Sequence, residues 1–124
     1  MKDFPNVLEH GIETVQSGVF PLAGNWSKDH FKNNNPLVLE LACGKGEFAL
    51  AMAKMWPERN YLGIDIKGAR MYVGANEALS SDLRNVAFLR TRIDFVETFF
   101  GEDEVDEIWI TFPDPQPQDN RAKK

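Results

Sequence analysis

The sequence has little of what disulfide, metal or membrane chemistry requires. Its one cysteine, Cys43, cannot form an internal disulfide, and its two histidines, His10 and His30, are isolated from each other. No targeting-type segment and no long apolar run is found. We therefore expect a cytoplasmic protein with no metal site and no membrane contact.

Basic residues are also scarce. The chain has 14 Lys and Arg against 19 Asp and Glu, a net charge of −5, which disfavours a broadly basic nucleic-acid-binding surface. Much of the acidic charge is local, in residues 102–107, where we expect a solvated loop. With 124 residues, 43% of them hydrophobic, the chain can bury one core.

The most informative segment is LVLELACGKG, residues 37–46. An apolar strand that contains Glu40 breaks into a turn with Gly44 and Gly46, and a helical pattern follows. In doubly wound parallel sheets, this first strand-to-helix turn is where dinucleotides and S-adenosylmethionine bind. Cys43 has no histidine nearby in the sequence, so we interpret it as a small packing residue rather than a nucleophile.

Strand and helix patterns alternate along the chain, which predicts an α/β fold with a parallel sheet and right-handed crossovers. Residues 1–35 are expected to form an irregular arm anchored by Trp26 and Phe31, and residues 36–124 a partial cofactor-binding domain. The expected strands are 37–41, 60–65, 86–90 and 107–112, and the expected helical segments are 47–56, 69–79 and 95–100.

Two cofactors fit the glycine turn to different degrees. Gly44 to Ala49 matches the dinucleotide fingerprint, and Asp65 follows about 20 residues later at the end of the next strand, so NAD is an alternative. Glu40 disfavours NAD, because a carboxylate there would repel a pyrophosphate. The same carboxylate suits the cationic amino group or sulfonium of S-adenosylmethionine.

A second motif, TFPDP at residues 111–115, follows the fourth expected strand. Asp114 stands between two prolines that fix its backbone. Because parallel strands end at one edge of the sheet, we expect Asp114 to lie beside Glu40 and Asp65. The alternative is a rigid turn in which Asp114 caps backbone groups.

These motifs together resemble the bacterial tRNA (guanine-N7-)-methyltransferase family. The resemblance implies a Rossmann-like class I fold that uses S-adenosylmethionine to methylate N7 of a guanine in tRNA. It also implies that the chain is an N-terminal portion, truncated after the fourth of seven strands, and we expect this portion by itself not to methylate tRNA. The stretches that carry it are LELACGKGEF (39–48), GIDIK (63–67) with Arg70, NVAFL (85–89) and FPDP (112–115).

The resemblance also assigns roles to residues. Asp114 is implied as the active-site residue, and Lys123 and Lys124 as substrate contacts. Arg92 takes the place of an acid or amide that reaches the adenine. The cofactor-binding residues implied are Glu40, Ala42 (in place of a usual glycine), Gly44, Gly46, Asp65, Ile66, Ile93, Asp94 and Asp114.

Some alternatives stay open from the sequence. Asp94 begins an Asp-x-x-Glu pattern with Glu97, and we favour a helix cap there over an adenine contact. The chain is either a methyltransferase or a Rossmann module that binds NAD or S-adenosylmethionine without activity. The fourth strand is expected to leave an open edge that favours self-association.

Overall fold

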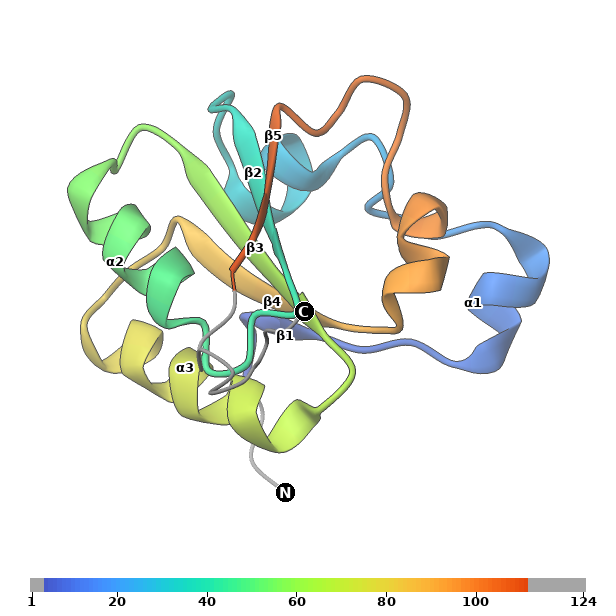
Figure 1. Ribbon diagram of the computed structural model, residues 1–124. Helices are drawn as coiled ribbons and strands as arrows, with labels where there is room; N and C mark the ends of the chain where they lie inside the picture. Colours follow the sequence, from blue (N-terminus) through green and yellow to red (C-terminus); the bar gives the residue numbers. More distant parts are fainter. Residues whose placement is uncertain (1–3, 112–124) are drawn as a thin grey trace, which may run out of the picture.

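The computed structural model describes residues 4–111. Its centre is a sheet of five parallel strands in the order β1-β4-β3-β2-β5 (Figure 1). The parallel sheet predicted from the sequence is confirmed. The strands are β1 (Val7–Leu8), β2 (Leu37–Leu41), β3 (Asn60–Asp65), β4 (Val86–Arg90) and β5 (Glu107–Ile110).

Helices cover both faces of the sheet and give two cores (Figure 1). On one face, α2 (Glu47–Met55) and α3 (Gly68–Ser80) bury small residues such as Ala49 and Ala75. The other core includes residues of the π-helix η1 (Trp26–Phe31) and the 3₁₀-helix η2 (Ile93–Phe99), and α1 (Ile12–Ser17) contacts η2. In the described residues, no helix is long and apolar enough to cross a membrane.

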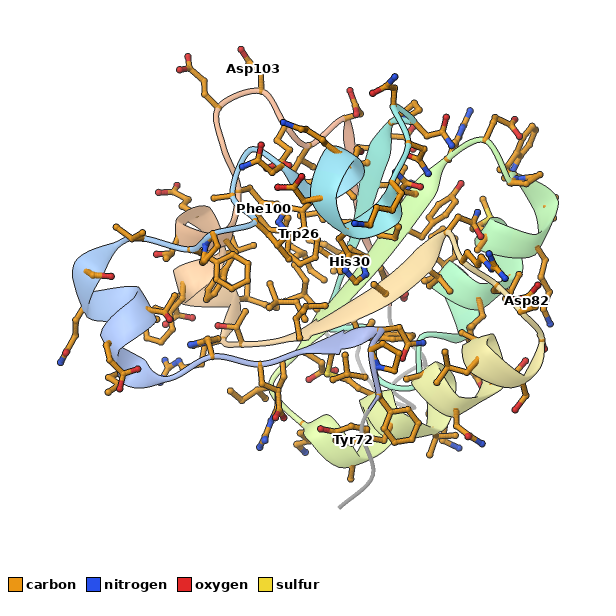
Figure 2. All side chains as sticks on the ribbon, turned by 180° about the vertical axis from the view of Figure 1, so that it is seen from behind. Trp26, His30, Tyr72, Asp82, Phe100 and Asp103 are labelled. Carbon is orange, nitrogen blue, oxygen red and sulfur yellow. The ribbon has the colours of Figure 1, made fainter. Side chains whose placement is uncertain are left out.

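The N-terminal arm is more regular than the sequence indicated. Val7 and Leu8 pair with Phe88 and Leu89, so the arm adds an edge strand to the sheet. Two residues are too few to show a strand pattern, which is why this strand was missed. Trp26 is fully buried and its Nε1 donates to the Phe99 carbonyl at 2.7 Å. Figure 2 shows Trp26 and Phe100 together in the interior.

The expectation of a solvated acidic loop at 102–107 was partly wrong. The Glu104 carboxylate accepts hydrogen bonds from the backbone N–H groups of Gly24 (2.6 Å), Trp26 (2.8 Å) and Gly101 (2.9 Å). It therefore fixes the arm against the loop before β5. Asp103, in contrast, projects outward (Figure 2).

Two glycines let the turn after β2 pack without side chains in between. A Cβ on Gly74 of α3 would lie 2.0 Å from the Lys45 carbonyl oxygen. A Cβ on Gly46 would lie 2.4 Å from Cε1 of Phe88 in β4. Both distances are shorter than any real Cβ contact. Helix α3 therefore packs directly on the backbone of the turn, and the turn packs directly on Phe88 of β4.

Candidate functional site

The site is at the carboxyl edge of the sheet, where the strand order reverses. Along the chain, β2, β3 and β4 build the sheet in one direction, and β5 then adds on the other side of β2. The order β4-β3-β2-β5 corresponds to strands 3-2-1-4 of a doubly wound sheet, whose ligands bind at this switch point.

The turn from Ala42 to Gly46 is wound tightly. Ala42, Gly44 and Gly46 have φ values of 57°, 58° and 75°, all in the left-handed region. Three hydrogen bonds hold the turn: Cys43 N–H to the Ile64 carbonyl (3.0 Å), Gly44 N–H to Asp65 Oδ2 (2.7 Å), and Gly46 N–H to the Cys43 carbonyl (2.8 Å). The turn is thereby fixed to the end of β3.

Asp65 has a structural role that the sequence analysis missed. Besides Gly44, its carboxylate accepts from the N–H groups of Ile66 (2.7 Å) and Lys67 (3.3 Å). One side chain therefore holds the glycine turn and the start of the loop before α3. In a sequence, an aspartate placed between a strand and the start of a helix indicates a side chain that accepts hydrogen bonds from nearby backbone N–H groups.

Glu40 in β2 is only 3% exposed and its two oxygens differ. Oε2 accepts a hydrogen bond from the Thr111 hydroxyl, whereas Oε1 has no partner within residues 4–111. Burial raises the pKa of this carboxyl above its ordinary value; the Thr111 hydrogen bond and, less strongly, the backbone N–H of Ala49 oppose the rise, and the charges of Asp65 and Glu47 add to it. An orphaned buried carboxylate oxygen is costly, and a cationic ligand would satisfy it.

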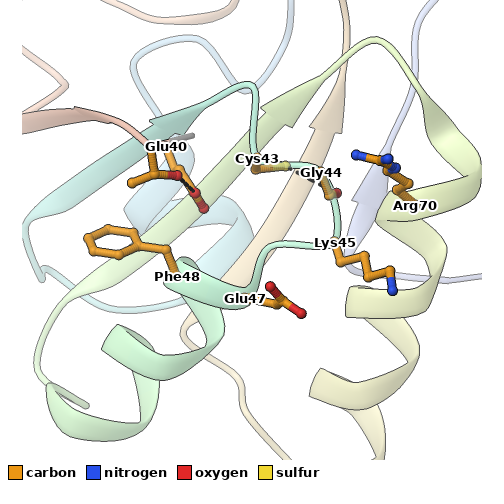
Figure 3. Close-up of a pocket in the computed structure, with 8 residues that line it drawn as sticks. Glu40, Cys43, Gly44, Lys45, Glu47, Phe48 and Arg70 are labelled. Carbon is orange, nitrogen blue, oxygen red and sulfur yellow. Dashed lines mark hydrogen bonds between the residues drawn. The ribbon is translucent and has the colours of Figure 1, made fainter. Parts of the chain in front are cut away.

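Glu40 opens into a cavity of about 220 Å³ on one side of the turn (Figure 3). Lys45 and Arg70 supply positive charge at its rim, and Arg70 Nη1 would lie 3.6 Å from a Cβ on Gly44. The cavity thus has an acid in its wall and two bases at its rim. Its lining consists of Glu40, Cys43, Gly44, Lys45, Glu47, Phe48, Arg70 and Thr111.

A second cavity of about 460 Å³ contains most of the other residues that the sequence singled out. It is built by the start of the glycine turn and by the segments that follow β3 and β4. Thr91 and Arg92 join the wall, although the sequence analysis gave Thr91 no role. Its lining consists of Ala42, Asp65, Ile66, Thr91, Arg92, Ile93 and Asp94.

The helix cap favoured for Asp94 was wrong. Arg92 is the residue before η2, no side chain caps its N-terminus, and Asp94 lies inside the helix. The Asp94 carboxylate instead pairs with Arg92 Nη2 at 2.8 Å. This charged neighbour two residues away competes successfully with the backbone N–H groups.

The remaining residues predicted from the sequence either have packing roles or lie outside the described part of the chain. Gly46 lines neither cavity, and its missing side chain serves the contact with Phe88. Cys43 is buried, and burial raises the pKa of its thiol, which agrees with a packing role. Asp114, Lys123 and Lys124 lie outside the described residues.

A parallel sheet with a glycine turn at its switch point defines a Rossmann-like α/β protein. Residues 34–124 match a protein family described as "Putative methyltransferase". The chain belongs to this methyltransferase family and has its Rossmann-like class I fold.

Curated relatives carry a more specific name. The chain is 54% identical over 119 residues to the tRNA (guanine-N(7)-)-methyltransferase of Porphyromonas gingivalis, covering 94% of this chain and 48% of that protein. It is 52% identical over 120 residues to the protein of that name from Christiangramia forsetii, covering 97% and 54%. The chain thus spans about half the length of the curated relatives it matches.

Solved structures show weaker similarity. PKMT2 from Rickettsia typhi has a TM-score of 0.43 and 20% identity, covering 72% of this chain and 15% of that one. The plantazolicin methyltransferase BamL has a TM-score of 0.45 and 15% identity, covering 71% and 30%. The family assignment rests on the sequence matches.

Ala42 gives a direct test of the turn geometry. A non-glycine residue in the left-handed region costs free energy, so Ala42→Gly is expected to raise the free energy of unfolding by about 0.5–1 kcal/mol after the entropic cost of glycine. Chemical denaturation measures this change. Lys32→Gly, at a φ of 64° after η1, is the matched control and should stabilise to a similar degree. Destabilisation by Ala42→Gly would mean that the alanine methyl group makes a packing contact worth more than the strain.

Proposed function

We propose that the protein transfers a methyl group from S-adenosylmethionine to N7 of a guanine in tRNA. The relatives named as tRNA (guanine-N(7)-)-methyltransferases support this proposal, since they match nearly the whole chain at about half identity. The proposal includes tRNA as partner and the cytoplasm as location, since tRNA is modified there.

The observation that carries the proposal is the buried Glu40 oxygen at the switch point, which has no hydrogen-bond partner among residues 4–111. The amino-acid end of S-adenosylmethionine is a zwitterion, and the smaller cavity has matching charges. Glu40 would receive the ammonium group, and Lys45 and Arg70 the carboxylate. A dinucleotide fits less well, because its pyrophosphate would meet the Glu40 carboxylate.

The larger cavity would hold the adenosine end. Asp65 has lone pairs left to accept from ribose hydroxyl groups. Ile66 and Ile93 offer apolar surface for the base, and Asp94 lies beside them with its Arg92 partner. Ala42 and Gly44 leave room for the chain of the ligand between the two cavities.

The proposed reaction depends on the relative orientation of the methyl group and guanine N7 more than on acid or base catalysis. S-adenosylmethionine, when bound, supplies an electrophilic methyl group on its sulfonium. Guanine N7 has a free lone pair at neutral pH, so no residue has to remove a proton. Glu40 and Asp65 would fix the cofactor, Asp114 would position the guanine edge as the catalytic residue, and Lys123 and Lys124 would contact tRNA.

Glu40→Gln tests cofactor recognition. We expect it to weaken binding of S-adenosylhomocysteine by about 1.5–3 kcal/mol, the value of a hydrogen bond to a charged group. Binding of 5′-methylthioadenosine, which lacks the amino-acid end, should be unchanged. Titration calorimetry measures both. Equal affinity of the variant and the wild type for S-adenosylhomocysteine would remove Glu40 from the site.

The same residue predicts a pH dependence. Because burial raises the pKa of Glu40, the carboxylate is charged above the raised pKa and neutral below it. Affinity for S-adenosylhomocysteine should therefore fall as pH falls through that raised pKa, and Glu40→Gln should remove this dependence.

Asp114→Ala tests the catalytic assignment. If Asp114 positions guanine in the transition state, kcat/KM of the whole protein for tRNA should fall by orders of magnitude while the affinity for S-adenosylhomocysteine changes less. Steady-state kinetics with tRNA transcripts measure the loss. Activity within about twofold of wild type, roughly 0.4 kcal/mol, would favour the alternative of a rigid turn.

We also propose that this 124-residue polypeptide self-associates through β5. Within residues 4–111 the strand is at the edge of the sheet, and Ile108, Trp109 and Ile110 are 58%, 43% and 59% exposed. Light scattering at micromolar concentration should show oligomers, and Ile110→Lys should reduce them. Val73→Lys, at an exposed apolar position on α3, is the control. A wild-type monomer at these concentrations would refute the proposal.

A further inference from the structure

The outer wall of the larger cavity is formed by two separate loops. One follows β3 and contains Ile66; the other follows β4 and contains Thr91 and Arg92. A backbone hydrogen bond from Thr91 N–H to the Asp65 carbonyl, at 3.0 Å, joins the second loop to the end of β3. The width of the cavity therefore depends on the other contacts that fix the positions of these two loops.

Arg90, the last residue of β4, links the loop after β3 to the N-terminal arm. Its Nε donates to the Ile66 carbonyl at 3.0 Å, and its Nη1 pairs with Glu9 Oε2 at 3.2 Å. Gly68 leaves space for the Arg90 side chain, since a Cβ on Gly68 would lie 3.2 Å from Cδ and Nε of Arg90. Glu9 thus holds the guanidinium against the loop after β3.

His10, next to Glu9, makes the second connection. Its Nδ1 is 2.9 Å from the Gly11 carbonyl oxygen, which only accepts, so Nδ1 carries the hydrogen. In the neutral ring, Nε2 then accepts from the Thr91 hydroxyl at 2.9 Å. The ring also packs on the buried Phe99 at 4.6 Å between centroids. The N-terminal arm thereby fixes the hydroxyl group of the buried Thr91.

The wall has a hollow behind it. A cavity of about 250 Å³ is lined by Glu9 and His10 from the arm, together with Phe95 of η2 and Arg90. It shares Ile66, Thr91 and Arg92 with the larger cavity. Close packing therefore does not support the wall there, and the discrete bonds from Glu9 and His10 carry more of its positioning.

We propose that Glu9 and His10 are positioning residues that hold the wall of the adenosine cavity at binding width. This inference rests on the proposed function, because it assigns the adenosine end of the cofactor to that cavity. Neither residue touches the cofactor, and each acts through one loop: Glu9 through Arg90 on Ile66, and His10 on Thr91. The N-terminal arm would therefore contribute to cofactor binding, although it does not contact the cofactor.

Binding of two ligands by calorimetry tests the proposal. S-adenosylhomocysteine and 5′-methylthioadenosine share the adenosine end and differ in the amino-acid end. His10→Leu, which keeps bulk on Phe99 but accepts no hydrogen bond, should raise the Kd for both ligands by about three- to tenfold, as expected for one lost hydrogen bond. Glu9→Gln should have a similar effect on both ligands.

Two variants separate positioning from general stability. His10→Gln restores an acceptor for Thr91, so its Kd values should return to within about twofold of wild type. Glu77→Gln removes the exposed Lys54–Glu77 pair between α2 and α3, at 3.5 Å, and should leave both Kd values unchanged. Thermal unfolding of each variant shows whether affinity changes without loss of the fold. If His10→Leu does not fold, Thr91→Val tests the same hydrogen bond.

The outcomes are distinguishable. Wild-type affinity in His10→Leu and Glu9→Gln, a loss confined to S-adenosylhomocysteine, or no recovery in His10→Gln would each overturn the proposal. If the wild-type protein binds neither ligand, the proposed function fails instead.

Discussion

The direct packing of the glycine turn on Phe88 and α3 is the constraint on which the site depends. Gly46 and Gly74 have no side chains where any Cβ would clash, so the turn lies flat against the core. In that position its Gly44 N–H reaches the Asp65 carboxylate, and Glu40 is enclosed behind the turn. The ligand-facing edge is thus a consequence of core packing.

The two acids at this edge differ because their surroundings differ. Asp65 accepts three backbone hydrogen bonds, so its charge is largely satisfied by the fold. Glu40 keeps one oxygen without a partner in the described part of the chain, and burial raises its pKa. A carboxylate oxygen without a partner in this part of the chain would be available for a cationic ligand, which supports our proposal of a zwitterionic amino-acid group over a pyrophosphate.

Sequence patterns predicted the central elements because their residues carry local signals. The strands at 37–41, 60–65 and 86–90 were predicted at their observed bounds, since each is centred on a short, mostly apolar run. Contacts across long sequence separations were not predictable: Glu104 binds Gly24 and Trp26, and His10 binds Thr91. The edge strand β1 is too short to show periodicity. The Asp94 cap failed because local patterns do not reveal which partner, Arg92 or the backbone, binds more strongly.

We propose that S-adenosylmethionine binds at this edge and extends across the two cavities. A crystal structure of the protein with S-adenosylhomocysteine tests it most directly. We expect the ligand amino group within hydrogen-bond distance of Glu40 Oε1 and the adenosine in the cavity lined by Asp65 and Ile93. A ligand bound elsewhere, or one whose amino group points away from Glu40, would contradict it.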